Sequence, residues 1–333
     1  MTDWVLITGG TGTIGSALVR MLLKAGRRVR IFSRDEDRQA KLKEALEREG
    51  FNFEQYRFFI GDVRDLPRLQ RAMKDVETVY NFAALKHVLA CEYSPGEAVK
   101  TNILGSMNLI DAAYFCGVKT VVAASTDKAA TGTSTMGVTK LVAERLLIQA
   151  NGHGCKFIVM RFGNVVGSRG SVLNRWEEQL RAGEILITDL DATRFVMSIQ
   201  QAAGLAVWAA HNGVGGEVFV NDMPVVRLGT LASVIIRNYE RKHDLEVGST
   251  KIKIIGLRPG ETMHEILATS EEISRAVDLR GMYAVLPNIR FADPGYQNAY
   301  GSKAKVAESL SSGDRKALDE DKTRSMLREW GLI

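Results

Sequence analysis

Thr126, Asp127, Lys128 and Lys140 are the residues whose types and spacing are best suited to catalysis. The first three follow a short apolar run that predicts a strand. A carboxylic acid beside an amine can protonate a leaving group and remove a C–H proton in the same reaction. Lys140 comes four positions after Met136, so a helix would place both side chains on one face. The sequence therefore predicts a reacting centre at the end of this strand.

Short apolar runs alternate with longer amphipathic stretches in the first half of the chain. The runs predict strands at Val5–Thr8, Val29–Phe32, Tyr56–Ile60, Thr78–Phe82, Thr120–Ala124 and Phe157–Phe162. The stretches predict helices at Ser16–Ala25, Glu36–Arg48, Leu66–Lys74, Ala98–Phe115 and Val138–Ala150. Each assignment rests on period-2 or helical spacing of apolar residues. This alternation predicts an α/β fold with a Rossmann-type, doubly wound parallel sheet covered by helices on both faces.

The alternation breaks beyond about Gly167, where the elements become shorter and turns are indicated at 213–216, 223–224 and 258–260. We therefore expect a dinucleotide-binding Rossmann core over residues 1–166, to which later segments return. Residues 167–333 are expected to form mainly a smaller, mixed substrate-binding domain. Within it, the charged stretch Asp314–Trp330 predicts a surface helix.

A glycine-rich turn lies between the first predicted strand and the first predicted helix. Glycines at this spacing permit a tight turn and let backbone N–H groups approach a pyrophosphate at the helix N-terminus. Its position in an alternating chain predicts a dinucleotide site. The residues expected to form it are Gly9, Thr11, Gly12, Thr13, Ile14 and Gly15.

The end of the second predicted strand carries Arg34 where an NAD site usually has an acidic residue. A guanidinium can hold a 2′-phosphate through two hydrogen bonds, whereas a carboxylate would repel it. With Ser33 and Arg38 beside it, Arg34 favours NADP over NAD. Further cofactor contacts are expected after the third and fourth strands, at Asp62, Val63, Ala83, Ala84 and Lys86.

With these motifs the chain resembles the extended short-chain dehydrogenase/reductases, whose pattern is GxxGxxG, a Ser or Thr after the fifth strand, and YxxxK. Within that family it is similar to the UDP-N-acetylglucosamine 4,6-dehydratases of bacterial glycan pathways. The segments that carry the resemblance are 33–36, 84–88, 100–103, 125–129, 161–165, 168–172, 193–195, 258–261 and 264–265. They span Gly9 to about Leu267.

The resemblance implies that the sugar is first oxidised at C4 by NADP, with a family tyrosine as the base on O4. Here Met136 occupies that position, and the chain has no tyrosine between Tyr114 and Tyr239. The family's lysine is retained as Lys140, which is expected to hold the nicotinamide ribose. A thioether cannot exchange a proton, so we expect Asp127 to receive the O4 proton, with Thr126 as its hydrogen-bonding partner.

The next steps implied by the resemblance are elimination and hydride return. Lys128 is expected to remove the C5 hydrogen as a neutral amine, its pKa lowered by cationic Lys140 and by partial desolvation. Asp127 then protonates the departing C6 hydroxyl, and the hydride returns to C6. The product is a UDP-4-keto-6-deoxy sugar. The dehydratases that invert C5 resemble this chain in having a lysine after the catalytic aspartate, and this resemblance favours inversion.

The same resemblance implies the substrate contacts. Asn164, Arg194 and Arg258 are expected to bind the nucleotide diphosphate, since a guanidinium pairs well with phosphate. The rest of the expected set adds Lys86, Ser168, Arg169, Val172 and Glu261 for the substrate, and Asp35 and Asn102 for the cofactor. His87 and His264 have no carboxylate at a suitable spacing and are assigned no catalytic role.

Two other functions stay open at this stage. A nucleotide-sugar 4-epimerase of the same fold would share the cofactor turn and the C4 oxidation, but it needs no elimination acid and base, so Asp127 and Lys128 argue against it. A non-catalytic NADP-binding sensor is suggested by Met136. The retention of Asp127, Lys128 and Lys140 together argues against a sensor.

The composition excludes several other classes. The 333 residues are 45% hydrophobic and 25% charged, which is typical of a globular protein, and a net charge of +5 gives little support to nucleic-acid binding. Three separated cysteines predict neither disulfides nor a metal site. No apolar run is long enough for a membrane span, and we expect a cytoplasmic enzyme. By resemblance, the helices at 98–115 and 138–150 would mediate homo-oligomer formation.

Overall fold

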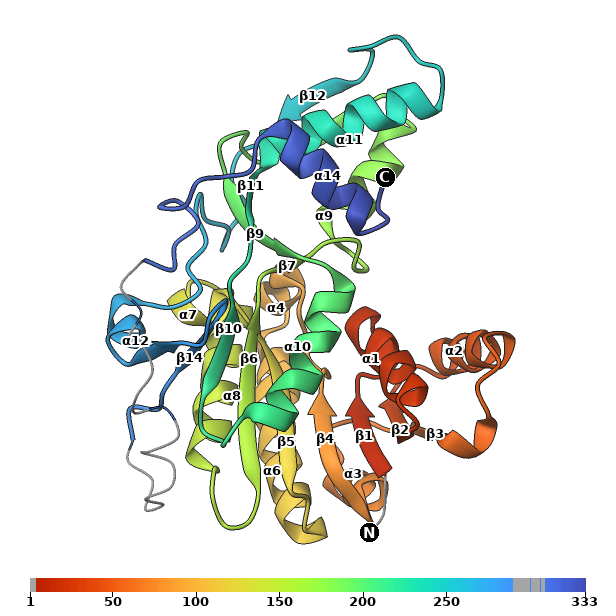
Figure 1. Ribbon diagram of the computed structural model, residues 1–333, viewed down its shortest axis with the longest axis vertical. Coiled ribbons are helices and arrows are strands. Elements are labelled where there is room, and N and C mark those ends of the chain that lie inside the picture. The colour runs from red at the N-terminus through yellow and green to blue at the C-terminus, as the bar shows by residue number, and fades with distance from the viewer. Residues whose placement is uncertain (1–3, 290–299, 301–305, 307–308) are drawn as a thin grey trace.

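A nine-stranded sheet forms the larger part of the molecule, in a computed structural model that describes residues 4–289, 300, 306 and 309–333 (Figure 1). The strand order is β13-β14-β10-β6-β5-β4-β1-β2-β3. The strands are β1 (Trp4–Thr8), β2 (Arg28–Ser33), β3 (Tyr56–Ile60), β4 (Val76–Asn81), β5 (Thr120–Thr126), β6 (Lys156–Phe162), β10 (Val218–Asn221), β13 (Ala276–Asp278) and β14 (Met282–Val285). From β3 to β10 every neighbouring pair is parallel, and β14 and β13 are added antiparallel.

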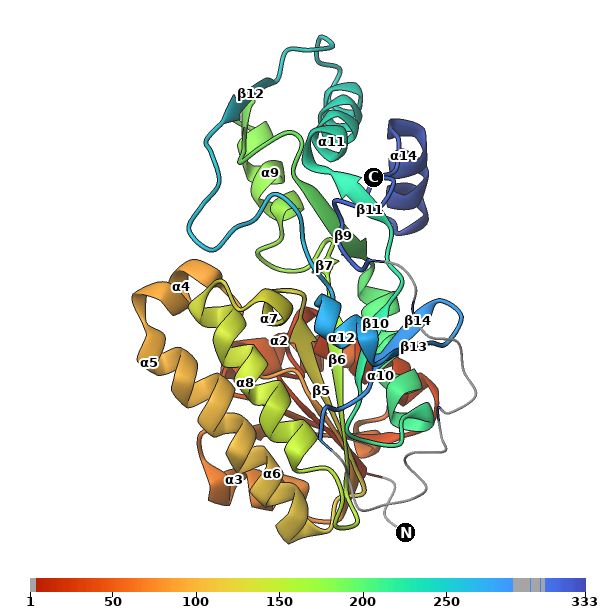
Figure 2. The ribbon, with the colours of Figure 1, turned by 90° about the vertical axis from the view of Figure 1, so that its left-hand side faces the viewer.

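Helices cover both faces of this sheet (Figure 2). One face carries α1 (Thr13–Lys24) and α10 (Ile199–Asn212), and the other carries α3 (Leu66–Met73), α6 (Gly105–Cys116) and α8 (Thr135–Gln149). The first strand pairs with both β2 and β4, so the chain order reverses there. Ligands of doubly wound sheets bind beside such a reversal, at the carboxyl ends of the strands. The expected α/β, Rossmann-type fold is confirmed.

The first helix shows why the amphipathic stretches become helices. Leu18, Val19, Leu22 and Leu23 are buried and recur three or four residues apart, which places them on the face that packs against the sheet. The next helix, α2 (Glu36–Arg48), begins where the Asp35 carboxylate accepts a hydrogen bond from a backbone N–H of its first turn. Asp35 is thus a helix cap as well as an expected cofactor residue.

The second half of the chain returns to the sheet before it forms a separate layer. Both α10 and β10 join the Rossmann core. The short helix α12 (Ser270–Ser274) and the strands β13 and β14 that follow it join the core as well. These segments lie far along the chain from the first six strands. The large sheet therefore includes residues from both sides of position 167.

The smaller unit lies beyond the carboxyl ends of the strands, at the top of Figure 1. Its elements are β7 (Asn164–Val165), α9 (Val172–Leu180), β8 (Glu184–Ile187), β9 (Thr193–Met197), β11 (Val225–Arg227), α11 (Leu228–Lys242), β12 (Lys251–Ile254) and α14 (Glu320–Glu329). Trp176, Leu231 and Leu327 belong to its own apolar cluster. The surface helix expected over Asp314–Trp330 is shorter, because it begins at an Asp319 cap and ends before Trp330.

A buried ion pair network fastens α12 to the Rossmann core. The Arg161 guanidinium on β6 donates to both oxygens of Glu144 on α8 and of Glu272 on α12, at 2.7–3.0 Å. Arg161, Glu144 and Glu272 are 1%, 2% and 4% exposed, so water solvates little of this network. The network joins segments more than 100 residues apart in the chain.

We expect Arg161→Ala to lower the free energy of unfolding by about 3–5 kcal/mol, because it leaves two buried carboxylates without their partner. Denaturant titration measures the change. Arg20→Ala is a matched control, since the Arg20–Glu49 pair lies at the surface and should contribute less than about 1 kcal/mol. Equal effects of the two substitutions would contradict this role of Arg161.

Candidate active site

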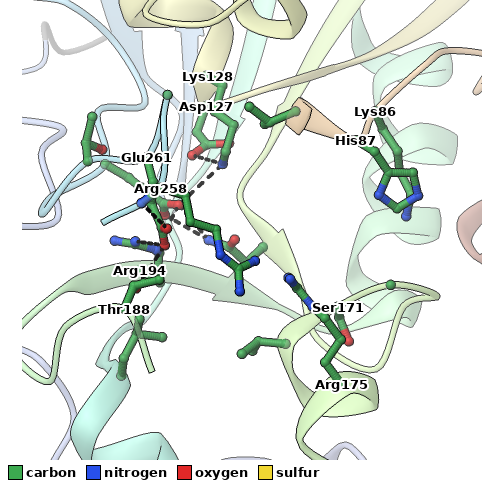
Figure 3. Close-up of a pocket in the computed structure, with 18 of the residues that line it drawn as sticks. Lys86, His87, Asp127, Lys128, Ser171, Arg175, Thr188, Arg194, Arg258 and Glu261 are labelled. Carbon is green, nitrogen blue, oxygen red and sulfur yellow. Dashed lines mark hydrogen bonds and ion pairs between the residues drawn. The ribbon is translucent and has the colours of Figure 1, made fainter. Parts of the chain in front are cut away.

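A pocket of about 490 Å³ lies between the Rossmann core and the smaller unit (Figure 3). The core contributes residues from the ends of β4 and β5, among them His87, Asp127 and Lys128. The smaller unit contributes α9, the ends of β7 to β9, and the irregular segment 258–266. Pockets of this size at the carboxyl ends of a doubly wound sheet are the usual ligand sites of such folds.

Asp127 lies directly after β5 and is 3% exposed. Thr126 Oγ1 donates a hydrogen bond of 2.7 Å to Asp127 Oδ1. The next residue, Lys128, begins the short helix α7 (Lys128–Thr131), and its Nζ lies 3.0 Å from Asp127 Oδ2. The structure thus brings together the acid and the amine that the sequence singled out.

Glu265 joins this pair from 137 residues further along the chain. Its carboxylate is 5% exposed and lies 3.5 Å from Lys128 Nζ. Asn164 Nδ2 donates to both of its oxygens, at 3.0 and 2.8 Å, and the backbone N–H of Phe195 donates at 3.0 Å. In the sequence, Glu265 appeared only within the segment 264–265 that carries the family resemblance, and no role was assigned to it.

The electrostatics of Lys128 differ from the sequence-based expectation. Burial alone would lower its pKa, but the carboxylates of Asp127 and Glu265 outweigh burial and hold the pKa above its ordinary value. The expectation that cationic Lys140 lowers the pKa of Lys128 is therefore wrong. Lys140 Nζ instead donates a hydrogen bond of 2.7 Å to the backbone carbonyl of Ala124. At neutral pH Lys128 rests as an ammonium ion.

The pKa values of the two carboxyl groups shift in opposite directions, and that of Lys140 shifts as well. Burial raises the pKa of Glu265 to about 7, and nearby Asp127 adds to this rise. Burial would also raise the pKa of Asp127, but Lys128 and Thr126 reverse this and keep it below the ordinary value. Burial lowers the pKa of Lys140 to about 8. Groups whose pKa values are pushed apart in one pocket are typical of acid–base sites.

Met136 occupies α8 one turn before Lys140, as the spacing predicts. It is 4% exposed and packs in a small cluster with Cys91, Ala98, Leu85 and Val88. These neighbours are apolar, apart from the buried thiol of Cys91. Met136, which the sequence analysis expected in place of a tyrosine, therefore has an apolar environment.

Asn164 and Arg194, both expected at the diphosphate, form hydrogen bonds and ion pairs with other residues of the protein. Asn164 Nδ2 bonds to Glu265 and to the backbone carbonyl of Phe195. Arg194 is 7% exposed and pairs with Glu261 at 2.9 Å and with Glu265 at 3.5 Å. Both residues line the pocket, but these donors are directed at protein groups, among them the carboxylates of Glu261 and Glu265.

Arg258 and Arg175 present their guanidinium groups to the pocket from opposite sides (Figure 3). Among the described residues, neither side chain forms an ion pair. Burial lowers the pKa of Arg175, and Arg258 lowers it further by repulsion. Two like charges facing one cavity favour an anionic ligand. The sequence predicted Arg258 but missed Arg175, which looks like any exposed charge on an amphipathic helix.

The expected cofactor turn joins β1 to α1. Gly9 has φ +66°, and a Cβ there would lie 2.7 Å from the backbone of Phe82; at Gly15 it would lie 2.5 Å from a carbonyl oxygen. The N-terminus of α1 has Gly12 as its cap, with no side-chain hydrogen bond. Its first amides are thus available to a phosphate. Thr11 lies in the same turn, and Thr13 and Ile14 begin α1.

Residues expected at the adenosine end lie after β2 and β3. Gln39 Nε2 bonds to Ser33 Oγ, and Arg34 pairs with Asp62 at 3.3 Å. Arg38 pairs with the helix cap Asp35. Val63 is buried beneath Gly105 of α6. These side chains surround the edge of the sheet where an adenosine ribose would lie.

A π-helical turn places Asn102 beside the segment after β4. The turn η2 (Val99–Leu104) precedes α6, where the sequence predicted one uninterrupted helix. Asn102 donates to the Leu85 carbonyl at 3.0 Å and accepts from the Leu85 N–H at 2.8 Å. Such turns often occur at functional sites. Asn102 thereby fixes the backbone beside Ala83 and Ala84.

Arg169 and Lys86 connect the smaller unit to the cofactor turn. The Arg169 guanidinium donates to the Thr11 carbonyl, and its backbone N–H donates to Thr13 Oγ1 at 3.2 Å. Lys86 Nζ donates to the Arg169 carbonyl at 2.9 Å. Arg169, expected at the substrate, is therefore placed on the cofactor turn, whereas Ser168, Val172 and Glu261 line the pocket.

Two further features concern metals and membranes. Over the described part of the chain, no group of three or more His, Cys, Asp or Glu side chains could hold a metal ion. In the same residues, no helix combines the length and apolar character needed to cross a membrane.

Comparison with known proteins places the chain in a family. Residues 5–287 match the model of the polysaccharide biosynthesis protein family. The UDP-N-acetylglucosamine 4,6-dehydratase (inverting) of Campylobacter jejuni is 38% identical over 319 residues, which cover 92% of this chain and 91% of that protein. The chain belongs to the extended short-chain dehydrogenase/reductases of the polysaccharide-biosynthesis type.

Other relatives have different names. A UDP-glucose 4-epimerase of Rickettsia conorii is 36% identical over 335 residues, covering 97% of this chain and 94% of that one. An uncharacterized membrane protein of Methanocaldococcus jannaschii is 41% identical over 331 residues, covering 98% and 95%. The X-ray structure of Pen from Bacillus thuringiensis superposes with a TM-score of 0.91 at 37% identity, covering 99% and 98%. The named enzymes among these are sugar-nucleotide dehydratases and epimerases.

Proposed function

We propose that this protein is an NADP-dependent UDP-N-acetylglucosamine 4,6-dehydratase. The observation that carries the proposal is the contact between Asp127 and Lys128, 3.0 Å apart at the wall of the pocket. An acid and an amine in contact at one sugar site suit elimination of water across C5 and C6. The similarity to a Campylobacter jejuni enzyme of this name supports the choice of substrate.

The residues divide the reaction between them. NADP, when bound, would supply the hydride acceptor for C4 and the hydride donor for C6. Asp127, oriented by Thr126, receives the O4 proton and later protonates the departing C6 hydroxyl. Lys128 removes the C5 proton once the C4 ketone has made it acidic. Lys140 contacts the nicotinamide ribose. The product is a UDP-4-keto-6-deoxy sugar, formed with no net oxidation or reduction.

The diphosphate would be held by Arg175 and Arg258. Both face the pocket without an ion-pair partner in the described structure, and their mutual repulsion is relieved by a doubly charged ligand. Charge-assisted hydrogen bonds from guanidinium to phosphate are among the strongest polar contacts. In this assignment Arg175 takes the place of Asn164 and Arg194 as a direct ligand of the diphosphate.

Inversion at C5 is the stereochemical outcome that we propose. A single lysine that removes the C5 proton and later returns one inverts the centre only if the sugar presents its opposite face to that lysine between the two steps, and Lys128 is 30% exposed in the pocket. The similar Campylobacter jejuni enzyme is named as inverting. The C5 configuration of the product, determined by NMR, tests this part.

NADP rather than NAD is proposed because Arg34, Ser33 and Arg38 lie together after β2. We expect Arg34→Ala to weaken NADP binding about tenfold, which corresponds to one charge-assisted hydrogen bond, with little effect on NAD. Binding titrations with both cofactors measure this. Arg27→Ala at the opposite end of β2 is the control. Equal weakening of NADP and NAD would show that Arg34 does not contact a 2′-phosphate.

Self-association is also proposed, through the helices beside the pocket. Among the described helices, α4 (Val88–Tyr93), η2, α6 and α8 lie side by side over one sheet face (Figure 2). Large apolar side chains stay exposed there: Leu89, Tyr93, Leu104, Met107 and Val138. Exposed apolar side chains on neighbouring helices favour burial against another copy of the chain.

A UDP-glucose 4-epimerase is the second candidate, favoured by the Rickettsia conorii relative. Incubation of the protein with UDP-N-acetylglucosamine, followed by mass spectrometry, separates the possibilities. The dehydratase gives a product lighter by one water. The epimerase gives an isomer of unchanged mass, and a non-catalytic NADP-binding sensor gives no product.

A further inference from the structure

Glu265 is a buried carboxylate in the pocket that the proposed reaction leaves unused. Its Oε1 lies 3.5 Å from the amine of Lys128, which also contacts Asp127 at 3.0 Å. Asn164 Nδ2 and the Phe195 N–H hold the carboxylate in this place. The amine of Lys128 thus contacts two carboxylates, one from its neighbour in the chain and one from a distant segment.

The proposed reaction has a proton-counting difficulty. Elimination requires Asp127 protonated and Lys128 neutral at the same moment. At rest Lys128 carries a proton and Asp127 does not, so this pair holds one proton. When the O4 proton arrives, the pair holds two protons, one too many for the required state. A third group must accept a proton from Lys128.

We propose that Glu265 accepts a proton from the Lys128 ammonium when Asp127 takes the proton of O4, and that Lys128 thereby becomes the base for elimination. This inference rests on the proposed dehydratase function and extends it. Glu265 acts through Lys128 in this scheme, as a positioning residue that stores one proton.

The proton balance then closes within the three groups. After C4 oxidation both carboxylic acids are protonated and Lys128 is neutral. In the elimination Lys128 gains the C5 proton while Asp127 gives its proton to the C6 hydroxyl, which leaves as water. Lys128 next donates a proton to C5 as the hydride reaches C6. Glu265 finally returns its proton to Lys128, and the resting state is restored.

The surroundings leave few other acceptors. Lys140 Nζ is hydrogen bonded to Ala124, and Met136 lies among apolar neighbours and Cys91. Glu265 is faced by Asp127 and Lys128 from the β5 end and by Arg194 from β9. Burial and Asp127 raise the pKa of Glu265 to about 7, while the two cations limit the rise. A carboxyl group with this pKa can gain and lose a proton near neutrality.

The test is the pH dependence of turnover in Glu265→Gln. The wild-type rate is expected to fall below about pH 7, since Glu265 is then already protonated. In the variant the surplus proton must go to solvent, so we expect turnover about 10- to 100-fold slower at pH 7 and rising with pH through the alkaline range. A variant that loses the same factor at every pH would mean a structural role and would overturn the proposal.

Glu261→Gln is the matched control. Its carboxylate lies four residues earlier, pairs with Arg194 and lines the same pocket, but it makes no contact with Lys128 in the described structure. We expect it to alter substrate affinity while it keeps the wild-type shape of the pH profile. The same change of profile in both variants would also contradict the proposal.

A second readout does not need turnover. Loss of the Glu265 charge should lower the pKa of Lys128, so an acylating reagent should modify Lys128 faster in Glu265→Gln than in Glu261→Gln, as measured by peptide mass spectrometry. Equal rates of modification would show that Glu265 does not control the pKa of Lys128. If wild-type protein forms no 4-keto product, the dehydratase proposal itself fails. A normal wild-type product with an unchanged Glu265→Gln profile rejects only the role of Glu265.

Discussion

Lys128→Met is expected to reduce formation of the 4-keto-6-deoxy product by roughly 10²–10⁴-fold, the usual contribution of a positioned acid–base group. Methionine preserves much of the side-chain length but cannot take the C5 proton. The C4 oxidation should persist in part, because Asp127 and Lys140 remain. Single-turnover absorbance should then show reduced nicotinamide that accumulates without product.

Lys119→Met is the control for this substitution, since Lys119 lies exposed before β5, at the end opposite to the pocket. It should leave turnover unchanged. Near-native product formation by Lys128→Met would remove Lys128 from the elimination step. A loss of cofactor reduction as well as product would move its role to the first step.

The double variant Arg175→Ala, Arg258→Ala is expected to raise the KM for the UDP-sugar by roughly 10²–10⁴-fold. Each guanidinium would lose a charge-assisted contact worth about 1.5–3 kcal/mol. Neither arginine forms an ion pair within the described residues, so the substitution breaks no salt bridge there and stability should change little. Steady-state kinetics with UDP as a competing inhibitor provides the measurement.

Two outcomes would contradict this diphosphate site. Unchanged inhibition by UDP would place the nucleotide elsewhere. A large fall in kcat at an unchanged KM would assign the two arginines to the chemical step. Arg181→Ala, just beyond the end of α9, controls for the loss of positive charge near the pocket.

The sequence predicted the core of the fold because its signals are local. The strand predicted at Tyr56–Ile60 and the helix at Glu36–Arg48 have those bounds in the structure. The glycine turn is equally local, as its glycines lie between adjacent elements. By contrast, β13 and β14 are too short to show a clear period. They join the sheet only because β14 pairs with β10 and β13 pairs with β14.

The chemical environment of the site could be predicted only in part. Asp127 and Lys128 are neighbours in the chain, so their contact follows from the sequence. Glu265 reaches them from an irregular segment with no helical or strand pattern, and its carboxylate adds to the effect of Asp127 in raising the pKa of Lys128. Arg194 was a reasonable phosphate ligand by its motif, but the fold places Glu261 beside it.

The central claim is that a hydride taken from C4 returns to C6 of the same sugar as water leaves. UDP-N-acetylglucosamine carrying deuterium at C4 tests this most directly. The account predicts a product lighter by one water that carries the deuterium in its C6 methyl group, as seen by NMR and mass spectrometry. Deuterium that remains at C4 in a product of unchanged mass would contradict the account and support epimerisation.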